Sequence, residues 1–228
     1  MKILIQLFLM IFPQCIRRFF YRTLFGYKIH KTARIGFALI LSKELTMEEY
    51  TRIGHLTVIK PIDRVYMGPY ARIGAQNFIT GYNTSDKGYA KKVGFFSHIP
   101  ERKCELILQE DVAISSRHII DCNGGVYFGA HSSLAGMRSQ ILTHGIDAYN
   151  CRQDAKPVKI GNYVSIGSGS IVLKGTEIPD NVIIGAGAVL NKKYEESCKV
   201  YGGVPAKVKK DLSKEDIKWF SRPSGDVF

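Results

Sequence analysis

Histidine is the residue type in this chain best suited to proton transfer near neutral pH, and one histidine stands at a break in the sequence pattern. An unperturbed imidazole has a pKa of about 6.5, so it can remove a proton from a hydroxyl group whose oxygen attacks an electrophile. His144 ends the apolar run SQILTH and is followed by the polar stretch 145–157. The six candidate bases are His30, His55, His98, His118, His131 and His144.

The composition describes a globular chain with a strong positive charge. Its 228 residues are 45% apolar, which is ample material for a core. A formal net charge of +12 and a pI near 9.5 predict attraction to nucleic acid, an acidic membrane surface or a phosphorylated small molecule. The cysteines are odd in number, scattered and without a C-x-x-C pair, which argues against disulfides and a thiolate zinc site and favours the cytoplasm: Cys15, Cys104, Cys122, Cys151 and Cys198.

Residues 1–32 are expected to form an amphipathic helical segment. The apolar stretch 3–12 is shorter than the roughly 20 residues that a membrane-spanning helix needs. No small-x-small site follows, and Arg17 and Arg18 stand where one would be, which argues against a cleaved signal. Beyond Pro13 a helical wheel separates Arg17, Arg18, Tyr21 and Arg22 from Cys15, Ile16, Phe19 and Phe20. This pattern fits a helix lying on a membrane surface, or aromatics that cap the domain or a subunit contact.

A six-residue repeat predicts the fold. Large apolar residues recur at Ile160, Ile166, Val172, Ile178, Ile184 and Leu190, and small or β-branched residues at Val164, Ser170, Thr176, Val182 and Ala188. Period six fits neither a helix nor an alternating strand. It fits short strands joined by tight corners, so that three sides form a coil of about 18 residues and coils stack about 4.8 Å apart.

The same period occurs upstream, in the pairs and series Ile53 and Ile59, Met67 to Ile79, Leu108 to Val126, and Phe128 and Leu134. Two polar stretches without the period, 81–104 and 145–157, are expected to be loops ejected from the solenoid. We therefore expect a solenoid domain over residues 33–210, followed by a tail at 211–228. The stretch DLSKEDIKWFSRP in this tail predicts a short helix that folds over the last coil, with Ser213 and Asp216 as a capping-box variant and Trp219 as its anchor.

Several segments resemble the hexapeptide-repeat acyltransferases, a left-handed parallel β-helix family that includes maltose, galactoside, serine and polysaccharide acetyltransferases. They are RIG at 34–36, 52–54 and 72–74, KIGNYVSIGSGSIV, VIIGAGAV and the closing VYGGVPAKVKK. The resemblance implies an all-β, left-handed β-helix. It also implies a homotrimer with active sites between subunits that transfers acetyl groups from acetyl-coenzyme A to a sugar hydroxyl. The basic, amphipathic N-terminus favours a surface polysaccharide or its lipid-linked precursor, met at the inner face of the cytoplasmic membrane.

The segment LAGMRSQILTH resembles the family segment that ends at the catalytic histidine, so His144 is expected to be the general base. An acceptor must fix its tautomer, and a backbone carbonyl, Asp147 or Asp121 could serve. Asp121, Asp147 and His118 are candidates for contact with the acceptor substrate, although His118 could instead be a packed or exposed side-face residue. His131 is expected to be a solvated corner histidine. The stretches 81–104 and 145–157 would build the acceptor pocket.

The donor residues follow from the same resemblance. Small corner residues would let acetyl-coenzyme A approach the backbone, and the Ser168 N–H would stabilise the oxyanion. Ser165 stands where the family has an aromatic residue, so stacking on the cofactor is in doubt there. The positions that match the family are Gly167, Ser168, Gly185 and Ala186 at the corners, and Lys192, Lys207 and Lys210 near the phosphates.

Three other functions compete with this hypothesis. N-acetylation of an amino-sugar nucleotide needs similar chemistry. A zinc lyase of the gamma-type carbonic anhydrase kind would need stacked histidines, but His118, His131 and His144 are 13 residues apart rather than 18, so no metal is expected. A β-helix that only binds, for instance nucleic acid through 87–103, would leave the histidine and the G-x-P-A-K terminator unexplained, so nucleic acid is not expected as a partner.

Overall fold

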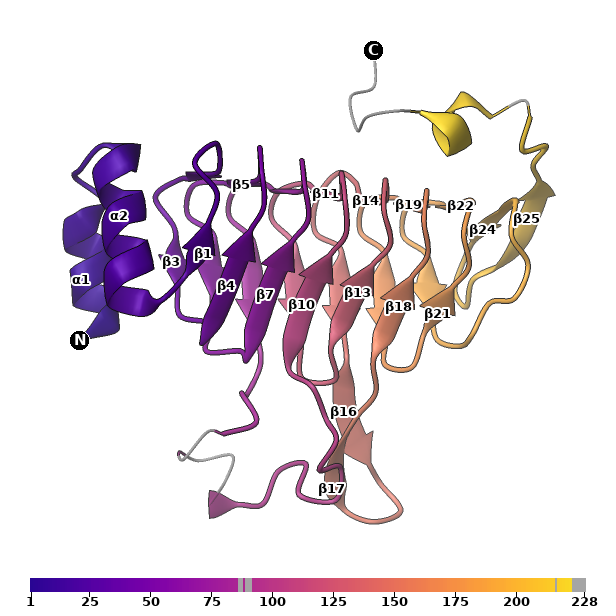
Figure 1. Cartoon of the computed structure of the whole chain (residues 1–228). Coiled ribbons are helices and arrows are strands. Elements are labelled where there is room, and N and C mark those ends of the chain that lie inside the picture. Colours follow the sequence, from indigo (N-terminus) through magenta and orange to yellow (C-terminus); the bar gives the residue numbers. More distant parts are fainter. Residues whose placement is uncertain (86–87, 89–91, 216, 223–228) are drawn as a thin grey trace.

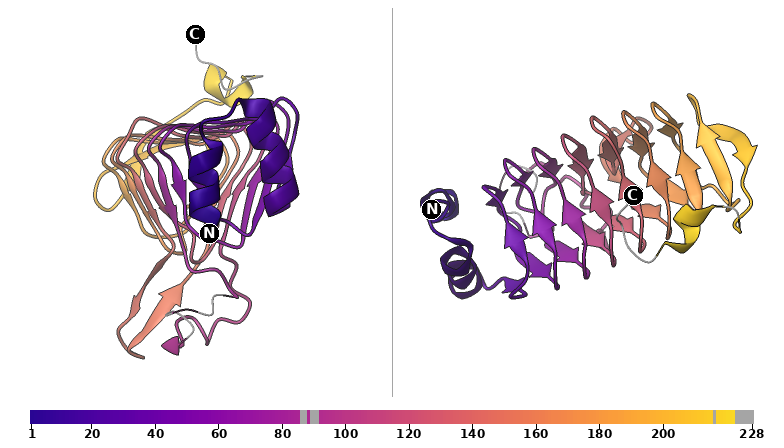
Figure 2. Two further views of the ribbon diagram at one scale, coloured as in Figure 1. Left: turned by 90° about the vertical axis from the view of Figure 1, so that its left-hand side faces the viewer. Right: turned by 90° about the horizontal axis from the view of Figure 1, so that it is seen from above.

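The computed structural model describes residues 1–85, 88, 92–215 and 217–222. Within them two helices precede a triangular solenoid built from three sheets (Figures 1 and 2). Sheet A contains β1 (Lys28–Ile29), β4 (Glu44–Met47), β7 (Arg64–Met67), β10 (Glu105–Leu108), β13 (Val126–Phe128), β18 (Val158–Ile160) and β21 (Glu177–Ile178). Sheet B contains β2 (Arg34–Ile35), β5 (Arg52–Ile53), β8 (Arg72–Ile73), β11 (Ala113–Ile114), β14 (Ser133–Leu134), β19 (Ser165–Ile166), β22 (Val182–Ile184), β24 (Lys199–Gly202) and β25 (Lys207–Asp211). Sheet C contains β3 (Leu39–Ile40), β6 (Val58–Ile59), β9 (Phe78–Thr80), β12 (Ile119–Asp121), β15 (Gln140–Leu142), β20 (Ile171–Leu173) and β23 (Val189–Leu190).

The chain winds through sheets A, B and C in turn, which confirms the predicted left-handed parallel β-helix. In Figure 1 it rises along sheet A at the front, crosses the top along sheet B and descends along sheet C at the back. Each coil advances away from the N-terminal helices, and this combination of rotation and advance is left-handed. Pairing of Ile160 with Ile178 shows the expected 18-residue coil. The coils begin at Lys28 rather than at residue 33.

The predicted six-residue series forms the core. Ile160, Ile166 and Val172 are almost fully buried, as are the later members of their series and the upstream equivalents. The second series points inward at the corners, where Val164, Ser170 and their equivalents are fully buried. Each large side chain removed from water contributes about 1.5–3 kcal/mol, which is why the period determines the fold.

Two helices close the open end of the first coil. They are α1 (Lys2–Leu9) and α2 (Gln14–Phe25), at the left of Figure 1. The buried Gln6 side chain donates to the carbonyl of Ile40 at 2.6 Å and accepts its N–H at 2.8 Å. Gln14 makes the same pair of bonds with Ile35. The two glutamines therefore take the place of a preceding strand at an otherwise unpaired sheet edge.

The face that α2 turns toward the β-helix is not its apolar face. Arg17 and Tyr21 are buried, and Arg17 donates to the Gly36 carbonyl at 3.1 Å. Phe19 is 61% exposed, whereas Phe20 is half-buried against the core. Of the two aromatics on that side of the wheel, Phe20 therefore packs on the domain, as the capping alternative expects, and Phe19 does not. Arg17 faces inward because the open coil end offers backbone carbonyls that need polar partners. No helix in the described ranges is long and apolar enough to cross a membrane.

Both predicted insertions leave the solenoid at the C–A corner, where the chain passes from sheet C to sheet A. Residues 81–104 join β9 to β10. Residues 144–155 form an antiparallel hairpin, β16 (His144–Asp147) and β17 (Arg152–Ala155), in place of the expected irregular loop. The two insertions lie side by side below the solenoid in Figures 1 and 2.

The C-terminal segment differs from the expected helix over the last coil. β25 pairs with β24 and covers the last rung, and in the part of the tail that the structure describes the one helical turn is the 3-10 turn Lys218–Ser221. Trp219 anchors this turn, as predicted. Its Nε1 donates to the Tyr163 carbonyl at 3.2 Å, so the anchor lies on the A–B corner and not over the last coil. Ser213 Oγ donates to Glu215, and Asp216 lies outside the described residues, so the capping box is not tested.

Candidate active site

The C–A corner brings His144 next to an aspartate from the preceding coil. β12 and β15 pair in parallel, so both end at this corner, and Asp121 at the end of β12 faces the residues that follow β15. Asp121 is buried, and the His144 side chain is 38% exposed. Nδ1 of His144 lies 2.7 Å from Oδ2 of Asp121. The stacking of successive coils therefore brings Asp121 and His144 together, although they are 23 positions apart in the sequence.

The carboxylate of Asp121 accepts hydrogen bonds on both oxygens. Oδ2 accepts the backbone N–H of Thr143 at 2.9 Å, its hydroxyl at 2.9 Å and the backbone N–H of His144 at 3.0 Å. Oδ1 accepts the side-chain amide of Asn123 at 2.6 Å. Burial opposes ionisation of this carboxyl, but the hydrogen bonds from His144, Thr143 and Asn123 together lower its pKa below the ordinary value. The group is thus a carboxylate near neutral pH.

This carboxylate determines what His144 can do. A carboxylate only accepts, so the neutral ring carries its proton on Nδ1 and keeps the lone pair on Nε2. The hydrogen bond to Asp121 raises the pKa of His144, against partial burial and the positive charges of Lys174 and Arg102. Of the three acceptors left open by the sequence, Asp121 holds the ring. Asp147 instead bonds Asn150 and Arg152 within the hairpin, at 2.8 and 3.1 Å.

Three further residues complete the surroundings of His144, and the sequence did not single them out. Asn123, which is buried, has its amide nitrogen 3.3 Å from Nδ1. Phe96 presents an edge-to-face contact with the imidazole at 6.2 Å between centroids. Arg102 stacks on Phe96 at 4.5 Å and donates to the Asn123 and Tyr82 carbonyls at 2.8 and 2.9 Å. The mixture of aromatic and basic residues in 81–104 is the sequence signal that could have indicated Phe96 and Arg102, and for Asn123 it is the position two residues after Asp121.

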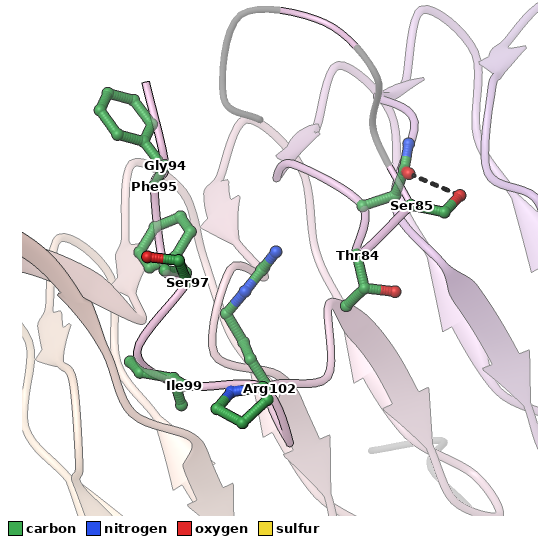
Figure 3. Close-up of a pocket in the computed structure, with 10 residues that line it drawn as sticks. Thr84, Ser85, Gly94, Phe95, Ser97, Ile99 and Arg102 are labelled. Atoms are coloured by element: carbon green, nitrogen blue, oxygen red, sulfur yellow. Dashed lines mark hydrogen bonds between the residues drawn. The ribbon is translucent and has the colours of Figure 1, made fainter. Parts of the chain in front are cut away.

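A hollow of about 260 Å³ adjoins this corner and is drawn in Figure 3. Arg102 projects between the segment that carries Phe95 and Ser97 and the segment that carries Thr84. Phe96 and Arg102 line the hollow and also contact the surroundings of His144. The remaining lining combines hydroxyl, amide and aromatic groups: Asn83, Thr84, Ser85, Gly94, Phe95, Ser97, Ile99 and Pro100.

The other candidate histidines lie elsewhere. His118 is 1% exposed at the B–C corner, inside the coil, with Nδ1 accepting the Ser139 N–H at 3.2 Å. Desolvation lowers its pKa. Its proposed contact with the acceptor is therefore wrong, and the packed alternative is the right one. His131 lies at the A–B corner, stacked on Tyr163 and 3.1 Å from Asp111, so it is not simply solvated.

The three histidines thus occupy three different corners of the coil, because 13 residues advance the chain by about two sides rather than three. Among the residues that the structure describes, no three His, Cys, Asp or Glu side chains gather as a metal site would require. A zinc lyase built from these histidines within one chain has no support.

The predicted donor residues form a separate group. Gly167 and Ser168 lie directly on Gly185 and Ala186 at the B–C corner, and a Cβ on Gly167 would meet the Ala186 nitrogen at 2.7 Å. Lys207 is near this corner, since it pairs with Gly202 at the end of β24. Lys192 instead follows β23 at the C–A corner, two rungs beyond His144, and Lys210 lies at the far end of β25, opposite Val200. Sheet C therefore separates the small donor residues from His144 within one chain.

Comparison with known proteins gives one family and several structures. Residues 157–192 match the family described as bacterial transferase hexapeptide (six repeats). A galactoside O-acetyltransferase of Escherichia coli K12 is 36% identical over 64 residues, which are 28% of this chain and 31% of that protein. The chain thus matches about a third of the length of this curated relative.

Two solved structures are among those similar to this chain. The polysialic acid O-acetyltransferase OatWY is 21% identical over 81% of this chain and 84% of that one, with a TM-score of 0.48. The hexapeptide-repeat acetyltransferase VCA0836 of Vibrio cholerae is 16% identical over 93% and 89%, with a TM-score of 0.46. The Vibrio protein has also been solved in complex with acetyl-coenzyme A.

Proposed function

The chain carries the hexapeptide repeat of bacterial transferases, and from this premise we propose that it is an acetyltransferase that moves an acetyl group from acetyl-coenzyme A to a sugar hydroxyl. The observation that carries the proposal is the pair His144 and Asp121 at the C–A corner, with Nδ1 and Oδ2 2.7 Å apart. A buried carboxylate that orients a half-exposed imidazole is the arrangement that a general base requires.

The residues of this chain would act on a single proton. Nε2 of His144 takes the hydroxyl proton while the sugar oxygen forms a bond to the thioester carbonyl carbon. Asp121 stabilises the resulting imidazolium, because its charge lies against Nδ1–H. The carbon–sulfur bond then breaks, and Nε2 returns the proton to the departing thiolate, so histidine ends neutral. The family resemblance assigns stabilisation of the oxyanion to the Ser168 N–H.

The hollow beside Phe96 and Arg102 supports a sugar as the acceptor. Sugars present hydroxyl groups and apolar C–H faces, and the hollow offers both kinds of partner, namely Asn83, Thr84 and Ser97 on one hand and Phe95 and Phe96 on the other. We assign the acceptor to a surface polysaccharide or its lipid-linked precursor. Asp147 would then contact it from the hairpin at the rim of the site.

A homotrimer with sites between subunits accounts for the distribution of the donor residues. The small residues Gly167, Ser168, Gly185 and Ala186 lie at the corner opposite His144 across sheet C. One chain therefore cannot bring both groups to one acetyl carbon. A neighbouring subunit packed against sheet C would supply the B–C corner to the His144 of the first, and the family resemblance assigns three subunits to the assembly.

Incubation of the protein with acetyl-coenzyme A and a panel of neutral, acidic and amino sugars tests the proposal. Thiol release and the mass of the product should report O-acetylation, and His144→Ala should lower the rate by at least about 10²-fold. His55→Ala is the matched control, since His55 is exposed far from this corner and bonds the Phe37 N–H. Acetylation of an amine alone would favour the N-acetyltransferase, and activity retained by His144→Ala would exclude His144 as the base.

A further inference from the structure

The N-terminal cap exposes nine large apolar side chains. They lie at Met1, on α1, on the turn after it and along α2, and none belongs to the core cluster or packs against it. Their exposed fractions run from 37% to 97%: Met1, Ile3, Leu4, Leu7, Phe8, Ile11, Ile16, Phe19 and Leu24. We call these residues the cap face. Exposed apolar groups concentrated in this way mark an interaction surface rather than scattered surface residues.

The exposure of the cap face is not due to poor packing of the helices on the first coil. The inner sides of both helices are fully used, since Gln6 and Tyr21 are buried and Gln14 bonds Ile35. Lys2 reaches inward to the Ser42 carbonyl at 2.8 Å. Apolar side chains such as Leu9 and Phe20 also pack against the core, so the residues of the cap face are additional to those that close the coil end.

The charge around the cap face identifies the kind of partner. Residues 1–43 contain eight Lys or Arg residues and no Asp or Glu, the first acidic residue being Glu44. Four that are exposed lie on α2 and the first coil, namely Arg22, Lys28, Lys31 and Arg34, whereas Lys43 is paired with Asp63 at 2.8 Å. Apolar groups beside such positive charges are complementary to an anionic lipid surface, whose acyl region takes the apolar side chains and whose headgroups attract the cations.

We propose that the cap face docks on the surface of an anionic lipid bilayer, with α1 and α2 lying in the plane of the interface. A second copy of the chain is the less suitable occupant, because two such ends would bring eight positive charges against eight. The helices have eight and twelve residues, which suits immersion in the interface rather than a crossing.

This orientation sets the distance of the active site from the lipid. The helices lie across the end of the solenoid, as Figure 2 shows, so the solenoid axis points away from the bilayer. His144 follows β15, which is four strands from β3 in sheet C. Four spacings of about 4.8 Å and a helix of about 10 Å place the imidazole roughly 30 Å above the interface. An acceptor carried on a lipid would be reached in its saccharide part, whereas docking itself does not depend on the proposed acetyl transfer.

Sedimentation of the full chain with lipid vesicles tests the proposal. Vesicles of phosphatidylglycerol with phosphatidylcholine should bind it at least about tenfold more tightly than phosphatidylcholine alone, and added salt should weaken the binding. Leu4→Glu with Phe8→Glu should weaken it by about 100-fold. Tyr149→Glu is the matched control, since Tyr149 is a fully exposed aromatic at the hairpin tip, and should leave binding within about twofold.

A second measurement uses the protein with the cap face intact. A polarity-sensitive fluorophore on Cys15, which is exposed on α2, should shift to the blue on anionic vesicles, in a chain with Cys151→Ser and Cys198→Ser. The same label on Cys151, in a chain with Cys15→Ser and Cys198→Ser, should not shift. Equal binding to neutral and anionic vesicles, no binding to either, or a change in self-association without a change in vesicle binding on Leu4→Glu with Phe8→Glu would overturn the proposal. None of these outcomes depends on whether acetyl transfer is observed.

Discussion

Asp121 holds His144 at two points, its backbone and its ring. Oδ2 accepts the backbone N–H at 3.0 Å and the Nδ1–H at 2.7 Å, so both the position of the residue and the tautomer of its ring are set by one oxygen atom. Because Asp121 ends a strand of the preceding coil, the stacking of coils determines the geometry of the pair. An imidazole held in this way loses little freedom when it takes a proton.

We therefore expect Asp121→Asn to lower kcat by at least about 10²-fold. The amide can donate to the ring and stabilise the wrong tautomer, and it cannot compensate the charge of an imidazolium. Rates of thiol release with the preferred sugar would measure the effect. Asp211→Asn is the control, since Asp211 is an exposed partner of Lys199 at the far end of the molecule. A loss of less than tenfold for Asp121→Asn would contradict the role assigned to this carboxylate.

The activity should depend on pH through His144. The base must be neutral to act, and hydrogen bonding to Asp121 raises its pKa above 6.5. The value of kcat/KM should therefore be constant at high pH and fall as the pH drops through a midpoint above 6.5. In Asp121→Asn the residual activity should show a midpoint at lower pH, because the stabilising charge is gone. A pH profile of both proteins, with an NMR titration of the ring, checks the sign; a wild-type midpoint below 6.5 would contradict it.

The glutamine that caps sheet C offers a test of stability. Gln6→Leu replaces the amide with an apolar side chain of similar size. The Ile40 N–H and carbonyl then lose their partner. Unmet buried groups cost about 1–3 kcal/mol each, so the free energy of unfolding should fall by about 2–4 kcal/mol. Denaturant unfolding measures it, with Gln109→Leu, an exposed position, as the control that should change by less than about 0.5 kcal/mol. Equal effects of the two substitutions would show that Gln6 does not cap the edge.

Arg102 should affect binding of the acceptor sugar and not binding of acetyl-coenzyme A. Its bonds to the Asn123 and Tyr82 carbonyls join the two ends of the first insertion to the C–A corner, and its stack orients Phe96 beside His144. We expect Arg102→Ala to raise KM for the sugar by about tenfold while KM for acetyl-coenzyme A stays unchanged. Arg64→Ala, on the outer side of sheet A, provides the control. An effect on the KM of acetyl-coenzyme A alone would contradict this role.

The six-residue period predicted the solenoid because the period is local. Each of Ile160, Ile166 and Val172 must point inward at fixed spacing, and any chain with that spacing buries them by the same winding. The ends of both insertions were predicted for the same reason, since they are the places where the period stops. The conformation of the second insertion was not predicted, because a short polar hairpin lacks a buried face that would leave an alternating pattern.

The neighbours of His144 depend on contacts between distant segments, so the sequence did not reveal them. Asp121 was one of three acceptors considered, and only the parallel pairing of β12 with β15 selects it. Phe96 and Arg102 reach the site through the path of an insertion. The sequence left open which side of α2 faces the domain, because a helical wheel does not show which side is buried; in the structure the open end of the β-helix presents backbone groups that bind Arg17 and Gln14.

The separation of His144 from Ala186 across sheet C gives the sharpest test of a site shared between subunits. His144→Ala removes the base, and Ala186→Trp should block the donor corner, where Ala186 is exposed. Each variant alone should be inactive. If each site takes His144 from one subunit and the B–C corner from another, random mixed trimers contain intact sites with a probability of one half times one half. Unfolding and refolding the two variants together should then restore about a quarter of the wild-type activity. Variants refolded separately and then mixed cold form the control, and a mixture that stays inactive after joint refolding would place the whole site within one chain or exclude the donor corner.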